Sequence, residues 1–201
     1  MSSSRYTLAG WLAISQAIIF PLAFVISIAQ TAIGVSAFGF QGPMLGPSDI
    51  LFLIFTGISI YTLLMFRNLL NERFNYHGIN TLIIISIWLG VLFQFGLIGL
   101  KGFHITLAPL SDTAFTIVNI VFISIGMIVA GIVDIFIAVK LLKIRESLSN
   151  LIKVFAYITM ITGICELTVI LSPLVLGILM PVIYILLGII FLQEKEEVEF
   201  V

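Results

Sequence analysis

Long apolar runs recur along the whole chain, and they restrict its possible folds more than any other feature. A helix needs about 20 mostly apolar residues to cross the ~30 Å hydrocarbon layer of a membrane. With 61% hydrophobic and 9% charged residues, this 201-residue chain has more apolar surface than one soluble domain could bury. The pattern predicts an all-α polytopic membrane bundle with six transmembrane helices, at residues 8–33, 50–66, 79–100, 114–140, 151–171 and 173–193.

The boundary between the last two predicted spans is not marked by polar residues, because residues 151–193 are almost continuously apolar. As a single helix they would extend about 64 Å, roughly twice the thickness of the hydrocarbon layer. Pro173 lacks an amide donor and restricts the backbone of Ser172 before it. We therefore expect a tight turn at residues 171–174.

The lysines and arginines predict an orientation. If the N-terminus is cytoplasmic, eight of the nine basic residues lie on the cytoplasmic side and only Lys101 lies outside. We expect both termini in the cytoplasm and a location in a cell inner (plasma) membrane. Residues 1–193 would form a single transmembrane domain, followed by an acidic cytoplasmic tail at 194–201.

Basic residues gather at the cytoplasmic edge of this predicted topology. They are expected to contact anionic lipid headgroups, at about 1 kcal/mol per residue, and a docking surface for a partner is the alternative. The chain has nine basic and ten acidic residues, so its overall charge does not suggest binding to nucleic acid. The candidate residues of this rim are Arg67, Arg73, His77, Lys140, Lys143, Arg145 and Lys153.

Two acidic residues fall inside predicted spans, where charge is costly and usually marks a partner or a function. Counted from the ends of their spans, Asp134 lies about 9 Å from the cytoplasmic side and Glu166 about 9 Å from the outer side. That count separates them by roughly 12 Å in depth, so we expect that they do not share a proton. Gln94 and Asn119 complete the set of candidate intramembrane polar residues.

Small and polar residues accompany both acidic residues at helical spacing. The stripe in the fifth span is Ala156, Thr159, Gly163 and Glu166, and the stripe in the fourth is Asn119, Gly126, Ala130 and Asp134. Small residues allow helices to approach closely in membranes, which favours packing interfaces. A proton or substrate path, or a contact with another subunit, are the alternatives.

Catalytic and metal-binding patterns are scarce in the sequence. His77 and His104 are predicted on opposite sides of the membrane, and the single Cys165 excludes an intramolecular disulfide. No familiar catalytic or phosphate-binding motif occurs. The sequence therefore favours a protein that is not an enzyme, with no catalytic, cofactor or metal site.

Two functions fit this pattern. The first is a scaffold, assembly or regulatory subunit of a larger membrane complex, with lipids and other subunits or further copies as partners. It depends on three absences: a soluble domain, a catalytic constellation and paired intramembrane charges. The alternative is a small transporter or channel with a polar path involving Glu166, Gln94 and Asn119.

Overall fold

The computed structural model describes residues 3–36, 46–106, 112–168, 170–171 and 174–196. Within these ranges the regular secondary structure is helical, without strands, and six of the helical segments are long and apolar enough to cross a membrane. The prediction of a six-span helical membrane protein is confirmed. The segments are α1 (Ser3–Ser36), α2 (Pro47–Phe74), α3 (Asn80–Thr106), α4 (Asp112–Lys143), α5 (Asn150–Leu167) and α7 (Met180–Glu196), with the 3₁₀ turn η1 (Arg145–Ser147) and the π-helix η2 (Val175–Leu179).

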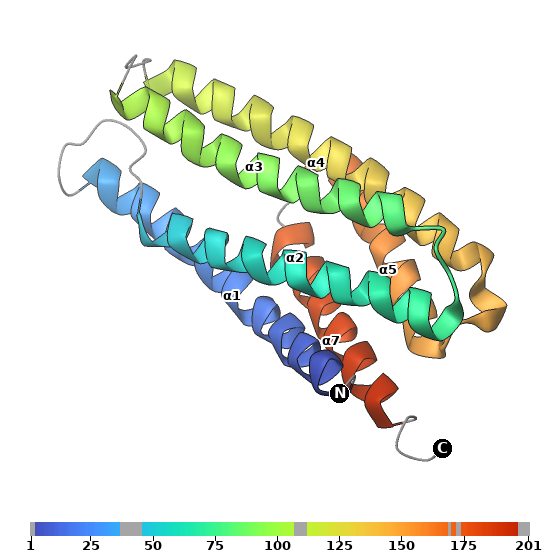
Figure 1. Cartoon of the computed structure of the whole chain (residues 1–201). Helices are drawn as coiled ribbons and strands as arrows, with labels where there is room; N and C mark the ends of the chain where they lie inside the picture. Colours follow the sequence, from blue (N-terminus) through green and yellow to red (C-terminus); the bar gives the residue numbers. More distant parts are fainter. Residues whose placement is uncertain (1–2, 37–45, 107–111, 169, 172–173, 197–201) are drawn as a thin grey trace.

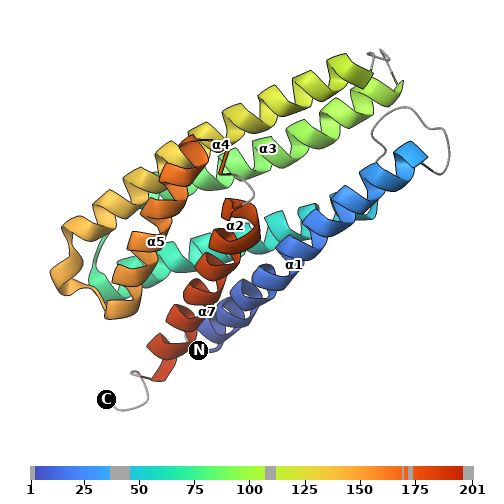
Figure 2. The ribbon, with the colours of Figure 1, turned by 180° about the vertical axis from the view of Figure 1, so that it is seen from behind.

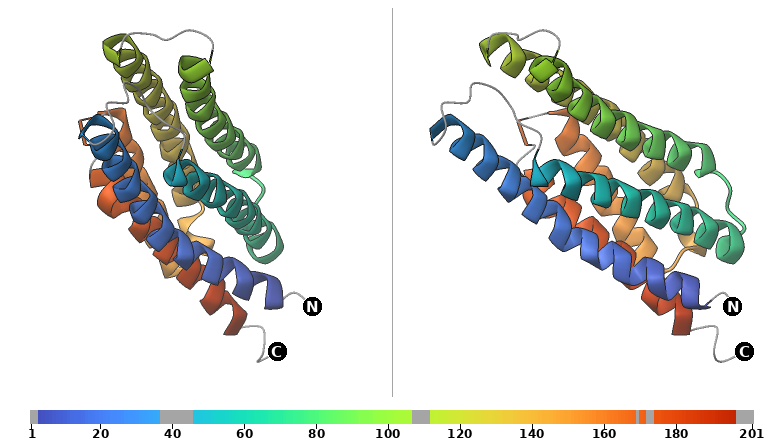
Figure 3. Two further views of the ribbon diagram at one scale, coloured as in Figure 1. Left: turned by 90° about the vertical axis from the view of Figure 1, so that its left-hand side faces the viewer. Right: turned by 60° about the vertical axis from the view of Figure 1, so that its left-hand side comes forward.

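The helices associate as two groups of three, and the groups adjoin where α2 lies beside α3 (Figure 1). One group is α1, α2 and α7, and the other is α3, α4 and α5. The pairs α1–α7 and α4–α5 make the most extensive contacts (Figure 3). Each of these pairs combines a long helix with a short one.

Glycines bring both pairs into close contact. A Cβ atom added to Gly131 of α4 would lie 2.6 Å from the carbonyl oxygen of Gly163 in α5, and one added to Gly163 would lie 2.7 Å from the Gly131 carbonyl. In the other pair, a Cβ atom on Gly188 of α7 would lie 2.9 Å from the Gly10 carbonyl of α1. The backbones approach so closely that only glycine fits, as expected for helix association in membranes.

The hairpin formed by α5 and α7 extends only part of the way along the bundle (Figure 2). From the crossing at Gly131 and Gly163, α5 continues for four residues to Leu167, whereas α4 continues for nineteen residues to Asp112. These lengths correspond to about 6 Å and about 28 Å of helix. Helix α5 ends at Leu167, before the expected end of the fifth span at residue 171, and residues 172–173 of the predicted turn lie outside the described residues.

A π-helix replaces the regular backbone where the hairpin turns back. Pro181 has no amide proton to donate to the carbonyl of Gly177, and its ring crowds that carbonyl. The helix widens before it, and the amide of Met180 donates to the Val175 carbonyl. Proline therefore modifies the first turns of this span without ending it.

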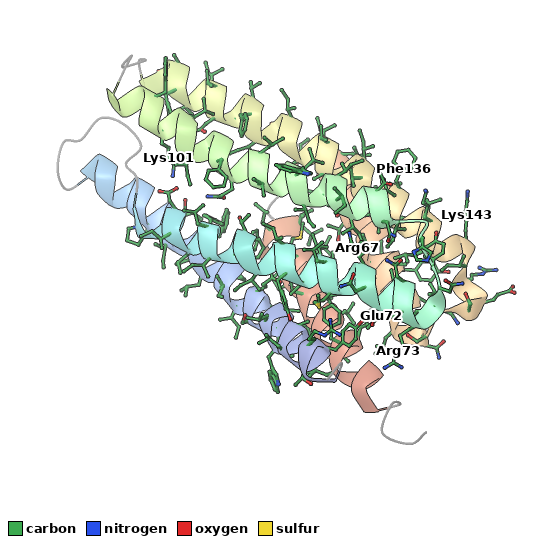
Figure 4. The ribbon with its side chains drawn as sticks, viewed as in Figure 1. Arg67, Glu72, Arg73, Lys101, Phe136 and Lys143 are labelled. Carbon is green, nitrogen blue, oxygen red and sulfur yellow. The ribbon has the colours of Figure 1, made fainter. Side chains whose placement is uncertain are left out.

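The two ends of the bundle differ in charge. Lys101 in α3 forms an ion pair with Asp49 in α2, with 2.7 Å between Nζ and Oδ1. Figure 4 shows Lys101 at one end and Arg67, Arg73 and Lys143 toward the other. We call these the Lys101 end and the termini end, because α1 begins and α7 ends at the latter (Figure 1).

The segment between α2 and α3 closes the termini end. Asn75 adopts a left-handed conformation (φ 48°), and the amides of Asn75 and Tyr76 both donate to the Leu70 carbonyl, which ends α2. The Tyr76 hydroxyl donates to the Lys140 carbonyl at 3.0 Å, and Lys140 Nζ donates to the Gly78 carbonyl at 2.8 Å. This turn is thus fixed to the end of α4.

Candidate functional site: an intramembrane polar cluster

Hydrogen bonds between side chains join α1 to α2 inside the membrane-spanning region. Gln16 of α1 is fully buried, and its Nε2 donates to Ser59 Oγ of α2 at 2.5 Å. The hydroxyl of Thr62, also fully buried, lies 3.1 Å from Gln16 Oε1 and can donate to it. A buried amide needs such partners because an unpaired polar group in an apolar environment is costly.

Tyr184 extends this network to the carboxyl groups. It comes from α7 and forms a side-chain hydrogen bond with Ser59. Its phenol also interacts electrostatically with Asp134 of α4 and Glu166 of α5. Five of the six membrane-spanning segments therefore contribute to one polar cluster, which consists of Gln16, Ser59, Thr62, Asp134, Glu166 and Tyr184.

The two carboxyl groups of the cluster are neighbours. The Cβ atom of Glu166 would lie 3.0 Å from a Cβ atom added to Gly131, one helical turn from Asp134. The two carboxylates interact electrostatically. The expectation that they lie at different depths was wrong, because counting from span ends assumes that every helix crosses the whole membrane, and α5 ends opposite the middle of α4.

Glu166 is 3% exposed, and its Oε2 atom has no hydrogen-bond partner among the described residues. The charged group that interacts with it is a second acid, Asp134. Placing an uncompensated carboxylate in an apolar environment is strongly unfavourable. The cluster therefore has an excess of negative charge that a proton or another cation can neutralise.

The cluster lies near the middle of the membrane-spanning region. Along α2, Ser59 is ten residues from Asp49 and eight from Arg67, or about 15 Å and 12 Å. These two charged residues bracket a length close to the ~30 Å thickness of the hydrocarbon core. Ser59 and the groups bonded to it are thus far from both ends.

The other two intramembrane candidates lie apart from this cluster. Asn119 is twelve residues from Gly131 along α4, which is about 18 Å. Its Oδ1 atom is buried without a hydrogen-bond partner among the described residues. Gln94 of α3 is 7% exposed and follows Phe93, whose ring stacks on Phe122 of α4.

The predicted stripe on α5 is a packing face. Its members Ala156, Thr159, Gly163 and Glu166 are all buried. The predicted stripe on α4 does not face one helix alone. Its member Gly126 faces α3, because an added Cβ atom there would meet the Phe93 ring, whereas Asp134 lies near the contact with α5. Gly131, which makes the contact with α5, was not among the residues singled out from the sequence.

The basic rim residues all belong to the termini end, but their surroundings differ. Arg67 is half-buried, with its Nη2 3.5 Å from Asn68 Oδ1, and Lys153 Nζ donates to Asn150 Oδ1 at 3.3 Å. His77 is exposed, with Nδ1 3.4 Å from Asn80 Nδ2. The remaining rim residues, Arg73, Lys140, Lys143 and Arg145, have exposed side chains.

The described residues contain no group of three or more histidine, cysteine, aspartate or glutamate side chains arranged to hold a metal ion. His77 follows α2, and residue 104 lies near the far end of α3, so the length of α3 separates them. The chemistry of the cluster is therefore that of carboxyl, amide and hydroxyl groups.

Sequence reasoning missed Gln16, Ser59 and Thr62. Gln16 is an amide in the middle of the first apolar run, and Ser59 and Thr62 are three residues apart in the second. Residues with that spacing lie on one face of a helix. Uncharged polar residues are common in such spans, however, and only the packing of α1 on α2 shows that these three meet.

Comparison with models of known protein families, with curated proteins and with solved structures finds no match to this chain.

Proposed function

We propose that this integral membrane protein is a small transporter, in which the Asp134–Glu166 pair carries a proton as part of the transport cycle. The observation that supports this is the meeting of two carboxyl groups from different helices near the middle of the span. Ionisable residues at such depth mark proton relays and ion pathways in pumps and transporters.

The backbone around the pair supports the same function. Helix α5 ends one residue after Glu166, and α7 is preceded by a π-helix. Interrupted helices near the bilayer midplane are a recurring feature of transporter binding sites. The helices divide into two groups. The carboxyl pair lies between α4 and α5, and its network reaches α7, α2 and α1. This arrangement is compatible with movement of one group of helices against the other.

One of the three arguments for a scaffold or regulatory subunit no longer holds. That interpretation depended partly on the absence of paired intramembrane charges, and Asp134 and Glu166 form such a pair. Co-purification with another membrane protein in fixed ratio, without any flux, would restore it.

Proton movement in liposomes tests the proposal. The purified protein is reconstituted with pyranine inside, and internal pH is followed after imposing a membrane potential, a Na⁺ gradient, a K⁺ gradient or a gradient of an organic cation. Under at least one of these gradients the wild-type protein is expected to move protons. Glu166→Gln and Asp134→Asn are expected to abolish this movement.

Glu146→Gln is the matched control, because Glu146 is an exposed carboxyl in η1 outside the cluster. It should move protons at the wild-type rate. Equal proton movement in wild-type protein and a folded Glu166→Gln variant under every gradient would contradict the proposal.

A further inference from the structure

Aromatic rings adjoin the polar cluster on its Lys101 side. The ring of Phe55 in α2 lies edge-on to Tyr184 in α7, with 5.4 Å between centroids. Phe20 of α1 lies 4.9 Å from Phe55 and 6.2 Å from Phe52. We call Phe20, Phe52, Phe55 and Tyr184 the aromatic group.

Tyr184 belongs to both sets of residues. Its ring packs on Phe55, while its hydroxyl bonds Ser59 and interacts electrostatically with Asp134 and Glu166. Carboxyl groups and aromatic rings thus meet at one residue. The four rings are half-buried, so they are not fully enclosed by the protein.

This combination selects a class of ligand. Ring faces attract cations, and the attraction is largest when the cation is poorly hydrated. A small inorganic ion instead requires several oxygen ligands, and a phenylalanine ring supplies none. An anion would face two acidic side chains, Asp134 and Glu166, which are the carboxyl groups that interact electrostatically with Tyr184.

We infer that the carboxyl pair and the aromatic group together bind a lipophilic organic cation, a quaternary ammonium or phosphonium ion, in exchange for a proton. This inference rests on the proposed transport function and names its substrate class. A carboxyl group without a counter-ion in this apolar setting keeps its proton. When the cation binds, one carboxyl O–H bond breaks, the proton leaves to solution, and the carboxylate balances the charge of the cation.

The titratable groups around Glu166 are few. Asp134 faces it from α4 and Tyr184 from α7, and Cys165 precedes it on α5. Glu166 is the carboxyl group whose Oε2 atom has no hydrogen-bond partner among the described residues, so it supplies the proton, and Glu166→Gln removes it while Asp134 stays in place. The stoichiometry of proton release therefore reports on Glu166 directly.

Calorimetric titration of the purified protein in detergent with tetraphenylphosphonium provides the test, with a protein-free detergent blank. Repeating the titration in two buffers of different ionisation enthalpy gives the protons released per bound cation. The wild-type protein is expected to bind and to release protons. Glu166→Gln is expected to abolish proton release or binding, whereas Glu146→Gln should behave as wild type.

Ring variants test the aromatic group. Phe55→Leu is expected to weaken tetraphenylphosphonium binding on the order of 10-fold. Phe20→Leu, which changes the ring that packs on Phe55, is expected to weaken binding in the same direction, and this keeps the test valid if Phe55→Leu fails to fold. Phe95→Leu is the control, because Phe95 is 59% exposed on α3. Equal affinity in wild type and a folded Phe55→Leu variant would overturn the inference.

The liposome experiment separates the two proposals. Proton movement driven by a Na⁺ or K⁺ gradient but not by tetraphenylphosphonium would overturn the substrate class and leave the transport function standing. The absence of proton movement under every gradient would overturn both.

Discussion

At the scale of single residues, Glu166 is the clearest sign of function. It is buried and shares its surroundings with a second carboxyl group, and its Oε2 atom has no protein partner within the described ranges. A structural polar residue in a membrane normally finds a hydrogen-bond partner, as Gln16 does. On this basis we propose a packing role for Gln16 and a ligand-binding role for Glu166.

Tyr76, outside the membrane spans, gives a prediction about pH. Burial raises the pKa of its phenol above the ordinary value, and its hydroxyl donates to the Lys140 carbonyl. The native state therefore keeps this proton at pH values where the unfolded state begins to lose it. The contribution to stability is complete below pH ~10 and is lost as the pH rises above it.

Tyr76→Phe should reduce this alkaline loss of stability. The measurement is the midpoint of thermal unfolding in detergent between pH 8 and pH 11, values chosen to bracket the ordinary phenol pKa of about 10. Tyr157→Phe, which changes an exposed tyrosine on α5, serves as the control. An identical decline in wild type and Tyr76→Phe would contradict the prediction.

At the scale of helices, the contacts at glycine determine where the carboxyl groups meet. The crossing of α4 and α5 at Gly131 and Gly163 sets the depth of Glu166, because α5 has only four residues beyond it. The crossing of α1 and α7 at Gly10 and Gly188 sets the position of Tyr184 in the same way, because Tyr184 lies one turn before Gly188 in α7. The site thus depends on two close backbone contacts.

Gly131→Ala should therefore destabilise the protein. The new methyl group would lie 2.6 Å from a backbone carbonyl oxygen, which cannot move unless the helices separate. We expect a loss of about 1–3 kcal/mol, typical of overpacking, measured by reversible unfolding in mixed detergent.

Gly57→Ala is the matched control, because an added Cβ atom there has nothing within 4 Å. Alanine is the better helix former, so this variant should be as stable as wild type or more stable by up to about 1 kcal/mol. Equal effects of the two substitutions would show that the α4–α5 contact is looser than the structure indicates.

The number and class of the helices could be predicted from the sequence because membrane spans need little beyond length and apolarity. The importance of Asp134 and Glu166 followed from the cost of charge in hydrocarbon. Their pairing could not be predicted, since it depends on α5 ending at Leu167 while α4 continues to Asp112. That difference arises from helix packing, and the apolar pattern of residues 151–193 gives no sign of it.

At the scale of the whole molecule, charge distinguishes the two ends of the bundle. The described basic side chains lie toward the termini end, apart from Lys101, which is neutralised by Asp49. This distribution predicts that the termini end faces the cytoplasm. The prediction concerns the intact membrane and requires a measurement there.

Single cysteines provide that measurement. In a Cys165→Ser background, Phe103→Cys places a thiol near the Lys101 end and Glu146→Cys places one at the termini end, both at exposed positions. A membrane-impermeant maleimide should label residue 103 in intact cells and residue 146 only after permeabilisation. The reverse pattern would overturn the orientation.

Cross-linking between α4 and α5 tests whether Asp134 and Glu166 meet within the membrane. In the Cys165→Ser background, Asp134→Cys with Glu166→Cys is treated with a short thiol-specific cross-linker, and Asn119→Cys with Glu166→Cys is the distant control. The cross-link would be detected after proteolysis between the two helices. We expect efficient cross-linking of residue 134 to residue 166 and little cross-linking of residue 119 to residue 166. Equal yields for the two pairs, or no cross-link between residues 134 and 166, would show that the two carboxyl groups do not meet.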